Sequence, residues 1–86
     1  MDASECISSW DGFEDLREQL RCVAKDLKTT SEFMYRNDQP TNNQLGANAN
    51  RAIRMGYILE YILHLCTREH NINPNLVDEE LESILG

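Results

Sequence analysis

Three residues, two of them close together in the sequence and one distant, have side chains that could hold a metal ion. Cys66 and His70 are four residues apart, which places both on one face of a helix, and Cys6 can approach the same end of the folded chain. A thiolate and an imidazole are donors that Zn²⁺ prefers. The spacing matches no closed structural zinc pattern, however, and a buried free cysteine is ordinary core material. We therefore expect no metal and no cofactor, with Cys6, Cys66 and His70 as the zinc alternative.

Catalytic chemistry has one candidate nucleophile. Cys22 lies beside Arg21 and Lys25, but no histidine with an orienting carboxylate can be placed around it. The carboxylates gather at the two ends of the sequence, on surfaces that we expect to be exposed rather than in a cleft. The four glycines are isolated, so the sequence has no phosphate-binding loop. We predict that the protein is not an enzyme.

Any site in this chain depends on the apolar segment from Gln44 to His70. The helix that it predicts is apolar on most of its circumference, so it must be covered from several sides. One of its lines passes through small residues, Ala49, Ala52 and Gly56. A second, larger line contains Met55, Ile58, Ile62 and Leu65.

Two further helices are predicted around this segment. Before it, seven residues recur at steps of three and four as a heptad seam: Phe13, Leu16, Leu20, Val23, Leu27, Thr30 and Met34. Pro40 stops that helix, Thr41 with Gln44 offers a capping box for the next, and Asn73 with Pro74 begins a short third helix.

The fold class that follows is all-α, in a single domain of residues 1–86. We expect a long antiparallel hairpin plus a short third helix, with helices at about 11–36, 42–70 and 74–85. Residues 1–9 are predicted to be flexible, and Trp10 to pack back onto the body of the protein. A chain of 86 residues lies near the lower limit for a single core, so dimerisation could complete the hairpin as a bundle.

Folding the hairpin back predicts which residues face one another. Val23 falls opposite Gly56 and Thr30 opposite Ala49, so the two backbones would approach closely along the small residues. In this register Gly56→Leu should overpack the interface and destabilise the fold. The third helix is expected to cover about half of the larger apolar line, the one that contains Met55.

Charge is distributed unevenly along the sequence. Six of the fifteen acids lie in residues 1–20 beside a single base, Arg17, and four lie in residues 71–86 beside none, whereas residues 21–70 are slightly basic. A net charge of −7 argues against direct nucleic-acid binding. No secretory signal and no apolar run long enough for a membrane span is present, so we predict a cytoplasmic protein with reduced cysteines and no membrane partner.

The surplus of apolar surface predicts a protein partner. We expect a small acidic module of the inhibitor, adaptor or chaperone type that presents an apolar and aromatic stripe to a helix or a basic surface of another protein. A homodimer is also predicted, and a compact monomer is the remaining alternative. The alternative function is an acidic nucleic-acid mimic that blocks a DNA- or RNA-binding protein. The expected contact residues are Met55, Tyr57, Ile58, Tyr61, Ile62, Glu14, Asp15, Glu18, Glu79 and Glu80.

Overall fold

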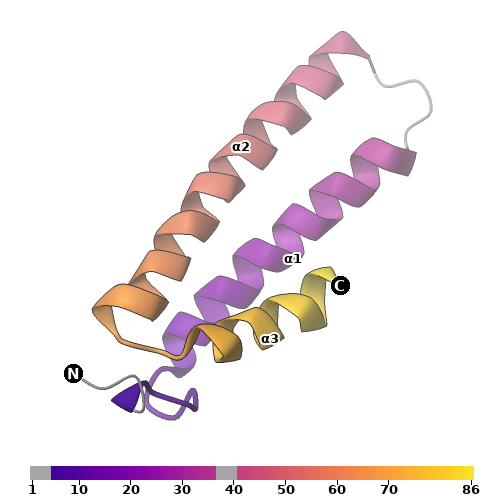
Figure 1. Ribbon diagram of the computed structural model, residues 1–86. Helices are drawn as coiled ribbons and strands as arrows, with labels where there is room; N and C mark the ends of the chain where they lie inside the picture. The colour runs from indigo at the N-terminus through magenta and orange to yellow at the C-terminus, as the bar shows by residue number, and fades with distance from the viewer. Residues whose placement is uncertain (1–4, 37–40) are drawn as a thin grey trace.

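The computed structural model describes residues 5–36 and 41–86, which form an elongated, all-α molecule of 52 × 20 × 19 Å. The elements are α1 (Glu14–Arg36), α2 (Asn42–His64), the π-helical turn η2 (Leu65–Glu69) and α3 (Pro74–Leu85). The first two helices lie side by side as an antiparallel hairpin, and α3 packs onto α1 (Figure 1). The predicted fold class is therefore confirmed. We call the end where α1 begins the open end and the end where α2 begins the turn end.

The predicted start signals of α2 and α3 are both present. The Gln44 backbone N–H donates to Thr41 Oγ1 at 3.2 Å, and the Thr41 N–H donates to Gln44 Oε1 at 3.0 Å, which completes a capping box. Asn73 Oδ1 accepts from the Asn75 N–H at 3.0 Å, and Pro74 occupies the first turn of α3. The break predicted at Pro40 lies outside the described residues.

The first helix begins later than the predicted residue 11. Gly12 has a φ of +86°, a left-handed conformation that a helix cannot contain, so α1 starts only at Glu14. Glu14 Oε1 accepts a hydrogen bond from the Gly12 N–H at 3.3 Å, which satisfies one backbone donor just before the helix begins.

The second helix ends in a wider turn. The His70 N–H donates to the Leu65 carbonyl, five residues back, at 2.9 Å. The Thr67 hydroxyl donates to the Leu63 carbonyl at 2.8 Å, which gives that carbonyl a side-chain partner at the transition. Asn71 then adopts a φ of +54°, one of the few conformations in which a non-glycine residue reverses a helix end.

The segment before α1 is more ordered than the sequence suggests. Ile7 and Ile72 form a parallel β-bridge, in which the Ile7 N–H donates to the Asn71 carbonyl at 2.9 Å and the Asn73 N–H donates to the Ile7 carbonyl at 2.8 Å. The segment of residues 1–9 that was expected to be flexible therefore has backbone hydrogen bonds to the rest of the chain at Ile7, while residues 1–4 lie outside the described part of the chain. Trp10 is buried against the core, as predicted.

The hydrophobic core lies at the open end, where all elements meet. Leu20 of α1, Cys66 of η2, Ile72 of the connection and Val77 of α3 are its fully buried side chains. Toward the turn end the hairpin continues with fewer buried residues, chiefly Ala24, Thr30 and Met55.

The predicted hairpin register is wrong. A Cβ placed on Gly56 would meet nothing within 4 Å, so no residue of α1 lies against it. The buried Thr30 hydroxyl donates to Met55 Sδ at 3.9 Å, instead of facing Ala49. The helix is rotated so that large side chains of its second line, Met55 and Ile62, enter the interface, because they remove more apolar surface from water than the small residues would.

Candidate protein-binding surfaces on α2

The three zinc candidates do not form a metal site. Cys6 does reach the open end, but its Sγ donates to Asn71 Oδ1 at 3.7 Å. Cys66 is completely buried, and the ring of His70 stacks at a tilt against Phe13 with centroids 5.4 Å apart. Over residues 5–36 and 41–86, no group of three or more His, Cys, Asp or Glu side chains is arranged to hold a metal ion.

The surroundings of Cys22 and Cys66 disfavour the thiolate form. Desolvation, a hydrogen bond from Cys22 Sγ to Glu18 Oε1 at 3.6 Å and the negative charges of Glu18 and Asp26 raise the pKa of Cys22 above its ordinary value. Burial raises the pKa of the Cys66 thiol as well. A raised pKa leaves less thiolate at neutral pH, which is the reverse of what covalent catalysis requires.

Among the residues whose burial the structure describes, the most exposed large apolar side chains form a row on the outer side of α2. Ile53, Tyr57 and Tyr61 follow one another at steps of four, and their exposed fractions are 57%, 70% and 63%. Residues spaced in this way lie on one face of a helix, here over about 12 Å of its length. We call these three residues the outer stripe. Two of them were predicted; Ile53 was missed, although its position four residues before Tyr57 was a usable signal.

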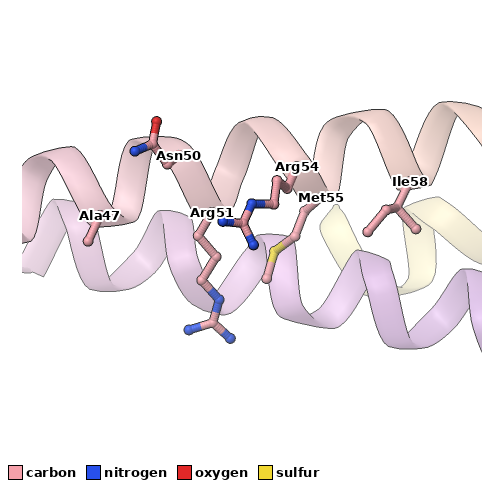
Figure 2. Close-up of a pocket in the computed structure, with 6 residues that line it drawn as sticks. All are labelled: Ala47, Asn50, Arg51, Arg54, Met55 and Ile58. Carbon is pink, nitrogen blue, oxygen red and sulfur yellow. The ribbon is translucent and has the colours of Figure 1, made fainter.

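The structure divides the remaining predicted apolar contacts. Met55 and Ile62 are only 9% and 3% exposed, because both side chains pack inside the hairpin, so little of either is open to a partner. Ile58 is 48% exposed and lines a surface hollow of about 610 Å³ on α2, together with Ala47, Asn50, Arg51, Arg54 and Met55 (Figure 2). The side chains of Arg51 and Met55 extend toward α1 in this view.

The predicted acidic contacts are also divided. Glu14, Asp15 and Glu18 are exposed on the first turns of α1, and Glu79 is exposed on α3. Backbone hydrogen bonds from its own N–H and that of Gly12 hold the pKa of the Glu14 carboxyl below its usual value.

Glu80 differs from the other acids because it is engaged inside the molecule. Its two carboxylate oxygens contact Arg17 at 2.7 Å and Arg21 at 2.6 Å, and its side chain is mostly buried. These two bases of α1 face α3, so the carboxylate of Glu80 is paired within the molecule rather than open to a partner.

Comparison with protein-family models, with curated protein sequences and with solved structures finds no match for this chain. The fold itself defines a small all-α hairpin with a third helix on one of its faces. None of the helices in the described part of the chain has the length and apolar character to cross a membrane.

Proposed function

We propose that this chain is a protein-binding module of the inhibitor, adaptor or chaperone type, and that the outer stripe makes the contact. The observation that carries this proposal is the exposure of one isoleucine and two tyrosines in a single row, on the side of α2 that its own fold does not use. Tyrosine is enriched at the centres of protein interfaces because it combines a large apolar ring with a polar group. Isolated soluble proteins rarely leave such rows uncovered.

The compartment proposed for this activity is the cytoplasm. The three cysteines of the protein are free thiols, which fits a reducing environment. A second copy of the chain is the other partner that the surplus apolar surface favours.

The competing function is an acidic mimic of a nucleic acid. It would use the exposed acids of the open end, which include Glu14, Asp15, Glu18 and Glu79. The pairing of Glu80 with Arg17 and Arg21 counts against it, because two guanidinium groups lie among these acids and reduce the local negative potential. We therefore prefer the outer stripe.

Affinity capture from the native cell, followed by mass spectrometry, tests the proposal. The wild type is compared with Tyr57→Arg/Tyr61→Arg and with a control, Asn75→Arg/Glu79→Arg, which adds arginines to exposed positions of α3. A partner that the control retains and the stripe variant loses, with both variants helical by circular dichroism, is the expected result. Equal capture by the wild type and the stripe variant would contradict the proposal.

Salt dependence separates the two functions. Contact through apolar side chains should change little between low and moderate salt, whereas a mimic should lose its partner steeply over the same interval. A steep loss, together with indifference to the stripe substitutions, would transfer the function to the acidic end.

A further inference from the structure

Two neighbouring surface hollows lie on one side of the hairpin, the larger lined by α2 alone and the smaller by both α1 and α2. The hollow that Ile58 and Arg54 line on α2 shares Arg51 with a second hollow of about 280 Å³, which Phe33 of α1 and Asn48 of α2 line. Phe33 and Ile58 are two of the large apolar side chains that remain exposed in the described part of the chain. We call the two hollows together the furrow.

The third helix does not cover the furrow. The last residues of α3, Ile84 and Leu85, lie over other hollows, whose walls on α1 include Lys28 and Glu32. No residue of α3 lines the furrow: the larger hollow is lined by α2 residues alone, and the smaller by residues of α1 and α2. The third helix was expected to cover about half of the line of Met55, Ile58, Ile62 and Leu65. Ile62 belongs to the core cluster that contains Val77 of α3, and Leu65 packs against this cluster, whereas Met55 and Ile58 line the furrow. The furrow side of the hairpin therefore carries no part of α3.

The charges along the furrow indicate what kind of partner could bind there. Arg51 and Arg54 lie on it in the turn half of the hairpin, and no carboxylate of a described residue lies within 4.0 Å of either guanidinium. The exposed acids Asp15 and Glu18 lie on α1 at the opposite, open end. If two such rods lie side by side in opposite directions, the bases of each meet the acids of the other.

We propose that the furrow binds a second copy of this chain in antiparallel orientation. The two hairpins would then form a four-helix core, with Ile58 and Phe33 in the contact. A twofold arrangement is closed, since each copy uses the same surface once and no further copies can add. The pairing also gives each unpaired arginine a carboxylate partner.

This interface leaves Ile53 and Tyr57 of the outer stripe free. Each is two residues from the buried Met55 and lies about 200° around the helix from it, whereas Tyr61 is three residues from Ile58 and lies beside it. A dimer formed through the furrow would therefore leave Ile53 and Tyr57 of each copy facing outward. The dimer goes beyond the proposed function and does not depend on it.

Sedimentation equilibrium from micromolar to millimolar concentrations tests the dimer. We expect the wild type to approach twice the 9.9 kDa of one chain. Ile58→Arg, which puts an unpaired cation into the contact, should raise the dimer dissociation constant about 100-fold or more. Tyr57→Arg on the outer stripe is the matched control and should leave the dissociation constant unchanged. A wild type of 9.9 kDa throughout, or equal effects of the two substitutions, would overturn the proposal.

Two further variants test the charge pairing and protect against a folding artefact. Arg51→Glu/Arg54→Glu changes exposed side chains only, so the helical signal should persist while the dimer weakens about tenfold or more at low salt. A second variant, Asp15→Arg/Glu18→Arg, keeps Arg51 and Arg54. Mixing it with the first variant should restore a heterodimer, because opposite charges then meet at both contacts. An unchanged dimer in the first variant, or no heterodimer in the mixture, would contradict the antiparallel pairing.

Orientation is measured directly with a spin label on Asn43→Cys at the turn end, in a Cys6→Ser/Cys22→Ser background that leaves only the buried Cys66. The antiparallel arrangement separates the two labels by most of the 52 Å length of the rod. Labels close together would show a parallel dimer and overturn the arrangement. Because none of these measurements uses the cellular partner, a failed dimer and a failed outer stripe give different results.

Discussion

Glu80 of α3 and Arg21 of α1 lie 2.6 Å apart, carboxylate oxygen to guanidinium nitrogen, and this contact ties the third helix to the hairpin. The other carboxylate oxygen of Glu80 lies 2.7 Å from Arg17, one turn earlier on α1. Burial alone would raise the pKa of Glu80, but the hydrogen bonds and the positive charges of the two arginines hold it below its ordinary value of 4.5. The shorter helix thus has one polar anchor in addition to its apolar contacts.

Removing the charge of this anchor should loosen α3. We expect Glu80→Gln to lower the free energy of unfolding by about 1–2 kcal/mol, because two charge-assisted contacts at a mostly buried carboxylate are lost. Urea denaturation followed by circular dichroism at pH 7 measures the effect. Glu79→Gln is the matched control at an exposed position and should change stability by less than about 0.5 kcal/mol. Equal effects of the two would mean that Glu80 does not anchor α3.

The same anchor makes the fold sensitive to acid. The pKa of Glu80 is lower in the folded than in the unfolded chain, so its contribution to stability is complete above the unfolded pKa, about 4.5, and is lost as the pH falls through the folded value. The difference in melting temperature between wild type and Glu80→Gln should therefore be constant near neutral pH and shrink below about pH 4.5. Glu14, whose pKa is also lowered, is present in both proteins and does not affect the difference. A difference that grows toward acid would contradict the assignment.

Sequence patterns predicted elements better than contacts between elements. The caps at Thr41 and Asn73 are local: they need only a side chain and a backbone N–H two or three residues away, so both were correct. The helix rotation was not local. Small residues at Ala49 and Gly56 suggested close backbones, but the interface instead selected Met55 and Ile62, whose burial contributes more free energy.

The candidate surfaces show the same division. The sequence analysis placed Tyr57 and Tyr61 among the expected contact residues, and both are exposed. It could not identify Glu80 as a paired residue, because its partners lie 59 and 63 positions earlier in the sequence, and only the docking of α3 brings them together. The β-bridge between Ile7 and Ile72 was beyond prediction for the same reason, since a single bridge has no alternating pattern of its own.

The sequence predicted that a larger side chain at Gly56 would overpack the hairpin interface, but the structure has open space at this position. Because a Cβ at this position would meet nothing within 4 Å, Gly56→Ala should stabilise the protein by about 0.5–1 kcal/mol through its higher helix propensity. Thermal and urea unfolding measure the change. Gly12→Ala is the contrasting variant: at a φ of +86° a side chain is strained, and we expect a loss of about 1–2 kcal/mol. Destabilisation by Gly56→Ala would restore the close-packed register that the sequence favoured.

The thiols should differ in reactivity. Alkylation with iodoacetamide at pH 8, resolved by site with mass spectrometry, should modify the exposed Cys22 well before the buried Cys66, which becomes reactive only on unfolding. Because the hydrogen bond and charge of Glu18 help to raise the pKa of Cys22, Glu18→Gln should accelerate alkylation at Cys22. The rate at Cys66 serves as the internal control and should not change. A slower reaction of Cys22 in this variant would contradict the role of Glu18.

Trp10 offers a test of how the N-terminal segment is held. Its ring is buried against the core, but its Nε1–H has no hydrogen-bond partner among the described residues. Since no hydrogen bond is lost, Trp10→Phe should cost less than about 1.5 kcal/mol, the volume change being its main penalty. Trp10→Ala removes the whole ring and should cost about 3–5 kcal/mol, enough to threaten the fold of so small a domain. Urea denaturation followed by circular dichroism compares the two, because both variants lose the fluorophore. If Trp10→Phe proves as costly as Trp10→Ala, the indole N–H makes a hydrogen bond that stabilises the open end, and apolar packing alone does not hold this segment.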